Sequence, residues 1–453
     1  MFDTLTKYWK LHKVAILLSA LGVLLYAFFA FQLVRTDFPK LLGLFTALFF
    51  IYLKLIQFEK WNLRFLVGMG VLFRLLFLLA EPNLSQDYFR FIWDGELAAQ
   101  GINPYLYTPY TLIAQTDVPI ANAQVLYDGM GSLSARNYSN YPPFNQLLFA
   151  LASLLGGKTI FGSLLVMRTT IILADIGILY FGRKLLLYLN KSPHLIFWYF
   201  LNPLVIIELT GNLHFEGVML FFFVWALFLT AVKKWLPAAV VYAISIGVKL
   251  VPLLFLPLVL KYFGLKKSVL FYGSVVLFCF LMVVPFYSPE FITNYSKTVG
   301  LWFSNFEFNA GLYNGIKLLA VQFDAKPWEL IKTYGKITPI LTIAVVLYCT
   351  FFRDTKKITV LLNAMLWVLS FYYLTSPTVH PWYLIFLVTL CIFTSFRFPI
   401  VWSGLAVLSY FAYANETFSE NLWLLGLEYA LLFGYMGYEI ITVWGKKVFF
   451  RKN

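Results

Sequence analysis

Three carboxylates stand close together in a chain that is otherwise mostly apolar: Asp87, Asp94 and Glu96. Membrane proteins keep few ionisable side chains near hydrocarbon, and those that they keep commonly bind or react. The residues that follow, 98–110, are polar, aromatic and irregular, so they must lie at or above the membrane interface. The pattern predicts the mouth of an active site.

Asp87 is the expected general base, because it stands at the exit of a predicted membrane helix beside the aromatic Tyr88. The alternative is a structural role, either as an interfacial carboxylate or as a helix cap, since Ser85 and Asp87 could both cap a following helix. Asp94, seven residues further on, would share a helical face with Asp87. Asp94 and Glu96 could bind an acceptor or a metal ion, or they could be solvated loop charges.

The composition is that of a polytopic membrane protein. Of the 453 residues 61% are hydrophobic and 12% are charged, where soluble domains carry about 25% charged residues. The net charge of +14 comes from Lys and Arg in short clusters between apolar runs, as in cytoplasmic loops, and does not indicate nucleic acid. The three cysteines lie within apolar runs and are expected to act as small hydrophobic residues.

The apolar runs predict about 12 to 14 transmembrane or re-entrant helices in one all-α domain, 1–453. Placing the basic loops in the cytoplasm puts both termini there, with a retained first helix and a long first outer loop, 81–143. This assignment requires 144–155 to dip into the membrane or lie along it. It also requires 236–260 to enter and return, with its turn near Lys249. The other predicted outer segments are 212–216, 287–336 and 375–381.

Several short motifs resemble, in the same order, the landmarks of the first GPI mannosyltransferase and of bacterial polyprenyl-phosphate-mannose-dependent enzymes with the GT-C fold. The resemblance covers most of the chain, from Leu84 to Tyr383. Its motifs are Asp87-Tyr88, Gly101-x-x-Pro104-Tyr105, Tyr141-Pro142-Pro143, Asp175-Ile176, Leu201-Asn202-Pro203-Leu204, Gly211-Asn212, Lys249-Leu250-Val251-Pro252 and His380-Pro381-Trp382-Tyr383.

The resemblance implies an inverting glycosyltransferase that moves a sugar, mannose by analogy, from a polyprenyl phosphate carrier to a lipid or glycan acceptor on the non-cytoplasmic side. It favours the bacterial plasma membrane over the endoplasmic reticulum. Two positions depart from the family pattern. Ser85 stands where the family has a first carboxylate, so a full D-x-D is absent, and His214 stands where an acidic residue follows Gly-Asn. No cofactor is expected; a divalent cation is the alternative, which the incomplete D-x-D does not support.

Transfer from a sugar phosphate needs one base for the acceptor hydroxyl and positive groups for the leaving phosphate. Lys249 interrupts an apolar stretch at a predicted helix break, where a buried ammonium needs an anion, and is therefore expected to bind the phosphate. The alternatives are snorkelling to the interface or a pair with Asp175 or Glu208. Arg168 and Asp175 are expected to pair with other helices.

His380 precedes Pro381, Trp382 and Tyr383 at a predicted helix start, and His380 and Tyr383 would face one side. His380 could bond a phosphate or a sugar hydroxyl, while Trp382 could stack on a prenyl chain or a sugar. The alternative for this group is an interfacial aromatic anchor.

Asn212, His214 and Glu216 are expected to open a helix on the outer side and to contact the substrate. Asn212 is the predicted N-cap, and a helix N-terminus suits an anion. Glu208, inside an apolar run, is expected to be a buried hydrogen-bonded carboxylate. A rival function for the whole chain is a lipid or sugar transporter, whose binding groups would lie near mid-membrane and which often shows inverted repeats. A polymerase or ligase of lipid-linked oligosaccharides would share most of the architecture.

Overall fold

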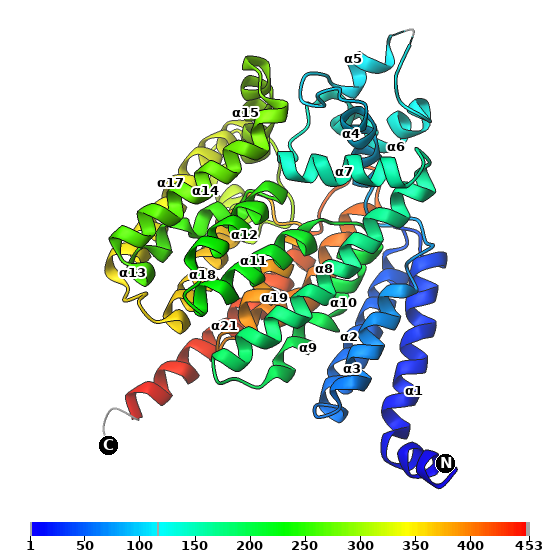
Figure 1. The fold of residues 1–453 in the computed structure, drawn as a ribbon, viewed down its shortest axis with the longest axis vertical. Coiled ribbons are helices and arrows are strands. Elements are labelled where there is room, and N and C mark those ends of the chain that lie inside the picture. The colour runs from blue at the N-terminus through cyan, green and yellow to red at the C-terminus, as the bar shows by residue number, and fades with distance from the viewer. Residues whose placement is uncertain (1, 116, 450–453) are drawn as a thin grey trace.

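The computed structural model describes residues 2–115 and 117–449, and its regular elements there are all helices (Figure 1). Within these residues seven helices are long and apolar enough to span a membrane, and a bent pair, 193–200 with 203–211, would make an eighth. The predicted all-α polytopic membrane fold is therefore confirmed. The seven are α1 (Phe2–Gln32), α2 (Phe38–Phe58), α8 (Ile160–Tyr188), α14 (Leu265–Val283), α17 (Pro327–Phe352), α18 (Ile358–Thr375) and α21 (Leu422–Phe449).

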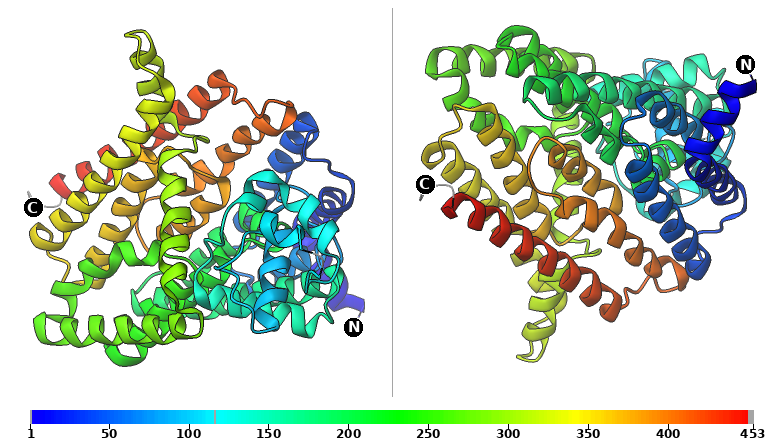
Figure 2. Two further views of the ribbon diagram at one scale, coloured as in Figure 1. Left: turned by 90° about the horizontal axis from the view of Figure 1, so that it is seen from above. Right: turned by 90° about the horizontal axis from the view of Figure 1, so that it is seen from below.

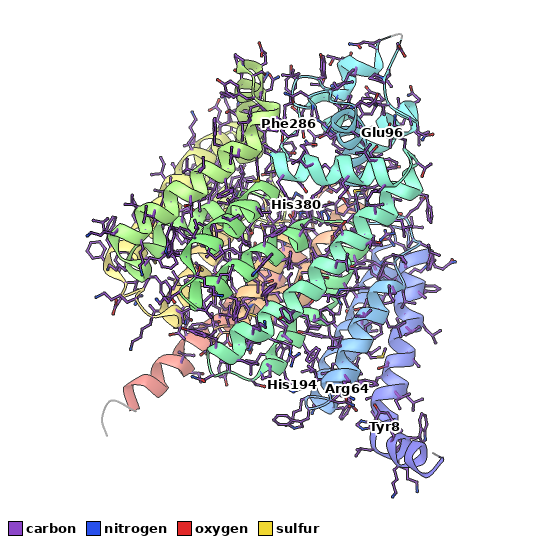
Figure 3. All side chains as sticks on the ribbon, viewed as in Figure 1. Tyr8, Arg64, Glu96, His194, Phe286 and His380 are labelled. Carbon is purple, nitrogen blue, oxygen red and sulfur yellow. The ribbon has the colours of Figure 1, made fainter. Side chains whose placement is uncertain are left out.

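The bundle has two unlike ends. The start of α1 and the end of α21 lie together at one end, and the segment that carries α4 to α7 covers the other (Figure 1). Arg64 and His194 lie at the same end as Tyr8, whereas Glu96 and Phe286 lie at the opposite end (Figure 3). Both termini thus share one end, as the charge pattern predicted. We call the opposite end, which carries residues 81–143, the α4–α7 end.

Residues 81–143 fold into helices rather than an irregular loop: α4 (Asp87–Ala99), α5 (Pro109–Ile113) and α6 (Ala123–Arg136). They are followed by α7 (Pro143–Leu155), and α4 packs closely on it. At Gly95 a Cβ atom would lie 2.4 Å from the backbone oxygen of Phe149, so only glycine permits this approach. The close contact holds the start of α4 over the bundle.

The two ambiguous regions each follow one of the predicted courses. In Figure 1, α7 lies transverse to the long helices, so 144–155 lies across the bundle instead of dipping into it. The second region contains α12 (Trp235–Val248), a break at Lys249, the 3-10 helix η3 (Val251–Val259) and α13 (Leu260–Phe263). Lys249 is extended, with φ −148° and ψ 143°, so the predicted break is confirmed.

Other predicted boundaries shift. The run 65–80 forms only α3 (Leu63–Leu75), and 195–209 is bent by 54° between its two halves, just before Pro203. The predicted outer segment 287–336 contains α15 (Pro289–Ser304), α16 (Gly311–Val321) and the first turns of α17. Seen along the long axis, α16 and the start of α17 protrude from the bundle, and α21 lies along one edge (Figure 2).

A buried ion pair joins α3 to α8. Arg74 Nε lies 2.7 Å from Asp175 Oδ2, and both side chains are fully buried. Arg74 also donates to the backbone oxygens of Gly70 and Phe200, and Tyr199 donates to Asp175. Arg168 donates to backbone oxygens only. The prediction that Asp175 and Arg168 pair with other helices is therefore confirmed, although Arg74 was not identified as the partner.

Candidate active site

Asp87 is the first residue of α4, and its side chain is half-buried. Its backbone N–H donates to Ser85 Oγ at 3.2 Å, whereas its carboxylate makes no hydrogen bond or ion pair within the described residues. The alternative in which Asp87 caps the helix is therefore wrong. The carboxylate is free to accept a proton or a hydrogen bond from a ligand.

Tyr88 is buried against Phe89, with ring centroids 4.0 Å apart. Burial, and then the nearby Glu81, raise the pKa of Tyr88, so its phenol stays protonated and can donate a hydrogen bond. Tyr141 lies in the turn before α7. Burial, and then the charge of Asp87, raise its pKa as well. Two neutral phenols thus lie near the start of α4.

Asp94 and Glu96 are both buried, so the alternative that they are solvated loop charges is wrong. Asp94 accepts from Arg90 Nε at 2.7 Å and from Gln146 at 3.1 Å, which ties α4 to α7. Glu96 accepts the backbone N–H of Ala121 at 2.5 Å, and burial raises the pKa of Glu96. These contacts give both carboxylates structural partners, and substrate binding by Asp94 stays a prediction.

Asn212 does not open a helix. The helix α11 (Glu216–Ala231) begins four residues later, after Leu213 in the left-handed conformation with φ 62°. The predicted N-cap is therefore wrong. The Asn212 Oδ1 atom instead accepts the backbone N–H of Leu84 at 3.0 Å and so holds the segment that leads into Asp87.

Lys249 pairs with Glu216, the first residue of α11, at 2.7 Å between Nζ and Oε1. The predicted alternative partners, Asp175 and Glu208, are wrong. Glu216 is buried, and its Oε2 has no hydrogen-bond partner within the described residues. The Lys249 side chain is 24% exposed, so its ammonium still faces solvent or a ligand on one side.

Aromatic rings stack in series beside this ion pair. The Trp382 indole lies 3.9 Å from the His214 ring and 4.4 Å from the His380 ring, and His380 also stacks on Phe308 at 4.9 Å. Tyr383 meets His380 edge-on at 5.4 Å, which confirms that His380 and Tyr383 face one side. Stacking of Trp382 on a sugar or prenyl chain stays a prediction, and its partners in the structure are the two histidines.

The buried His214 ring lies 3.3 Å from Glu208 Oε2, and Tyr410 donates to the other oxygen of Glu208. Glu208 is thus the buried, hydrogen-bonded carboxylate that was predicted. Burial, then His214 and Lys249, lower the pKa of His380 to about 3. The His380 ring is therefore neutral at physiological pH, and its unpaired Nδ1 can exchange a hydrogen bond but carries no charge.

These groups converge at one place. Asp87 and Glu216 both act electrostatically on Tyr141 and on Tyr383, and Lys249 acts on His380. Along the long axis of the molecule His380 lies just beneath α7, toward the α4–α7 end (Figure 3). The residues come from α4, the loop before α7, the start of α11, the break after α12 and the segment before 384. All of these are helix ends or breaks.

Arg35 belongs to the same region and was missed by the sequence reasoning. It follows α1 and donates to the backbone oxygen of Leu84 at 3.3 Å, and its guanidinium lies 4.4 Å from the Tyr413 ring centroid. The charge of Asp87 also acts electrostatically on Tyr413. Arg35 has no carboxylate partner within residues 2–115 and 117–449. The sequence did contain a signal for Arg35, because it is a lone arginine at the end of the chain's first span, away from the basic loops.

The motif Gly101-x-x-Pro104-Tyr105 serves the scaffold. Tyr105 is fully buried and donates to the backbone oxygen of Tyr141, and Asn103 donates to the backbone oxygen of Phe286 at 2.8 Å.

In the described part of the chain, no group of three or more His, Cys, Asp or Glu side chains is placed to hold a metal ion.

The arrangement combines one free carboxylate, an ammonium at a helix break, an unpaired guanidinium and partly exposed aromatic rings. It suits proton removal next to an anionic leaving group.

Comparison with known proteins supports a transfer reaction of this kind. The family model described as "Alpha-(1->6)-mannopyranosyltransferase, N-terminal domain" matches residues 7–263, more than half of the chain. No curated protein matches the chain. The matched region includes Asp87, Glu216 and Lys249, whereas His380 lies beyond it. The chain belongs to the alpha-(1->6)-mannopyranosyltransferase family and is an integral membrane glycosyltransferase that acts on mannose.

Proposed function

We propose that the enzyme takes mannose from a polyprenyl phosphate carrier and transfers it, with inversion, to a lipid or glycan acceptor on the non-cytoplasmic side. The observation that carries the proposal is the Asp87 carboxylate, which has no partner within the described residues and belongs to α4, at the end of the bundle opposite Arg64 (Figures 1 and 3). Because basic loops favour the cytoplasm, the opposite end, which carries Asp87, would face the non-cytoplasmic side. The GT-C fold that the sequence resembles is part of this proposal.

In the proposed reaction the acceptor hydroxyl lies against Asp87, which removes its proton as the new glycosidic bond forms. The bond between the anomeric carbon and the carrier phosphate breaks on the opposite face of the sugar, and the phosphate leaves as an anion. Lys249 and Arg35 are the cations available to stabilise its charge, since His380 is neutral. Tyr88, Tyr383 and His380 supply hydrogen bonds to sugar hydroxyls or to the phosphate, and Trp382 an apolar face.

The family description supports an α-(1→6) linkage, and we propose the same product for this chain. Because the transfer inverts the anomeric carbon, an α-linked product requires mannose that is β-linked to its carrier. A 6-hydroxyl acceptor is a primary alcohol, and primary alcohols are less crowded nucleophiles than ring hydroxyls.

The transporter alternative has no comparable support. The free carboxylate, the ion pair at the break and the aromatic stack belong to helix ends near the α4–α7 end, and the family match is to a transferase. A direct test is to incubate membranes that contain the full chain with polyprenyl-phosphate-[14C]mannose and a mannoside acceptor. We expect label in an acceptor product, and we expect an exo-α-mannosidase to release the labelled mannose from that product. Uptake of label into vesicles with no covalent product would support a transporter instead.

Lys249 should matter for donor binding more than for acceptor binding. A charge-assisted hydrogen bond contributes about 1.5–3 kcal/mol, so Lys249→Gln should raise the KM for the donor about 10- to 100-fold. Lys249→Arg should retain most of the affinity. Because removal of Lys249 also leaves Glu216 unpaired, Glu216→Gln is the matched control. It removes the pair but keeps the cation, and should bind the donor at least as well as wild type. An unchanged donor KM in Lys249→Gln would exclude the phosphate role.

Asn212 is expected to position Asp87 rather than to touch the substrate. Asn212→Ala removes the only side-chain hydrogen bond that the structure gives to the Leu84 N–H, so α4 can shift. A displacement of about 1 Å can cost about 10²-fold in rate, and we expect kcat to fall by up to that factor with both KM values nearly unchanged. Steady-state kinetics with both substrates varied distinguishes the cases. A selective rise in one KM would indicate direct substrate contact instead.

The proposed chemistry at Asp87 uses no resident metal, because Ser85 stands where a second carboxylate would be and its hydroxyl already accepts the Asp87 N–H. Activity of membranes treated with a chelator tests this point. We expect the rate at saturating substrate to persist. Complete loss of activity that Mg²⁺ or Mn²⁺ restores would contradict it.

A further inference from the structure

Two further carboxylates lie near the segment that carries Phe308: Glu420, on the connection between η6 (Ala406–Ala414) and α21, and Glu428, within α21. Glu420 and Glu428 border a small cavity of about 10 Å³, which is room for about one water molecule. The oxygen-bearing side chains around this cavity are Asn309, Ser409, Glu420, Asn421 and Glu428, and the apolar ones are Leu408, Phe411 and Leu425.

Within the part of the chain that the structure describes, neither carboxylate forms an ion pair. Glu428 is fully buried; its Oε1 accepts from Asn309 Nδ2 at 3.1 Å and from Trp402 Nε1 at 2.9 Å, and its Oε2 has no hydrogen-bond partner in the described residues. Glu420 accepts the backbone N–H of Asn309 at 2.5 Å. Lys317 acts on Glu420 only from a distance, because it pairs with Glu307 at 2.7 Å.

An independent oxygen points to the same cavity. Asn309 is fully buried, and its Oδ1 has no partner in residues 2–115 and 117–449. Its backbone is left-handed, with φ 47°, and is held there by Glu420 and by the Tyr429 hydroxyl, which donates to the Asn309 oxygen at 2.7 Å. A buried acceptor without a partner is unfavourable, and two neighbouring carboxylates repel each other. One cation would relieve all of these costs.

We propose that this cavity binds a hard divalent cation, Ca²⁺ or Mg²⁺, through carboxylate oxygens of Glu420 and Glu428 and the amide oxygen of Asn309. The donors are all oxygen, which excludes the softer metals that prefer sulfur and imidazole. Only two carboxylates contribute, so water must complete the shell, and the affinity should be that of weak extracellular sites, roughly 10⁻⁴ to 10⁻³ M. Ca²⁺ tolerates the irregular geometry better than Mg²⁺.

The site would also help to position the aromatic stack. Asn309 directly follows Phe308, which stacks on His380; the Phe308 N–H donates to the Pro377 oxygen at 3.0 Å, and Val379 donates back to Phe308 at 2.8 Å. A cation bound to Asn309 would therefore hold the segment that places His380. This consequence rests on the proposed function, whereas the binding itself does not.

The test uses the purified full chain in detergent, stripped with a chelator, with Tb³⁺ as a luminescent Ca²⁺ analogue. Because the Trp402 indole donates to Glu428, excitation of tryptophan should sensitise Tb³⁺ bound there. We expect emission that Ca²⁺ displaces, and a rise in Tm of about 1–2 °C at millimolar Ca²⁺. Glu428→Gln and Glu420→Gln should each lose both signals, whereas Glu416→Gln, which changes an exposed carboxylate on the same connection, should keep them.

Two results would overturn the proposal. The first is wild-type protein without displaceable Tb³⁺ emission and without a Tm that depends on Ca²⁺ or Mg²⁺. This result would show that the carboxylates hold a proton instead. Equal signals in wild type, Glu428→Gln and Glu420→Gln would place the ion elsewhere. If Glu428→Gln does not fold, Glu420→Gln decides the matter. None of these measurements involves sugar transfer, so their failure and the failure of the proposed function are separate results.

Discussion

Asp87→Asn is expected to lower kcat by about 10²- to 10⁴-fold while the donor and acceptor still bind. The amide keeps the size and one acceptor of the carboxylate but cannot take up the proton of the attacking hydroxyl. Because the Asp87 side chain makes no hydrogen bond or ion pair in the described structure, its loss removes no structural contact, and folding should be unaffected. The measurement is single-turnover transfer of labelled mannose, with expression and Tm as folding checks.

Asp128→Asn is the matched control. Asp128 is an exposed carboxylate on α6, at the same end of the protein, and accepts a hydrogen bond only from the neighbouring Gln124. It should turn over as wild type does. Asp87→Glu should retain part of the rate, because a base remains but is displaced by one methylene group. Wild-type turnover in Asp87→Asn would remove Asp87 from the mechanism and leave Glu216, whose charge also acts on Tyr141 and Tyr383, as the next carboxylate to test.

Asp175→Ala should destabilise the protein by about 3–5 kcal/mol, because Arg74 would remain buried with a full charge and no anion. Arg74 is fully buried, so its charge would stay away from water. The measurement is the thermal midpoint of the purified protein in detergent, together with the folded yield from membranes.

The double variant Arg74→Met with Asp175→Ala separates the ion pair from other contacts. It removes both charges, and replacement of a whole buried pair by apolar side chains is often neutral or stabilising, so it should recover most of the lost stability. Asp128→Ala, at an exposed site, should leave Tm unchanged. If Asp175→Ala has no greater effect than Asp128→Ala, the pair does not contribute to stability.

The sequence alone predicted the features that depend on neighbouring residues. Long apolar stretches defined the all-helical membrane fold, and the basic loops predicted that both termini share one end. Lys249 and Pro252 marked the break after α12 because a charge and a proline each interrupt an apolar helix locally. Even the pair of Arg90 with Asp94 follows from their spacing of four, although it was overlooked.

Only the tertiary structure decided which charged groups are satisfied and which are free. Lys249 meets Glu216 across 33 residues, Arg74 meets Asp175 across 101, and Asn212 holds Leu84 across 128. Such contacts depend on how helices pack and where they end. Hydrophobic periodicity determines neither the packing nor the ends of the helices. In the sequence Asp87 was the expected base among three nearby carboxylates, but nothing there showed which of the three has a partner. Packing buries and pairs the other two, and leaves Asp87 without a partner.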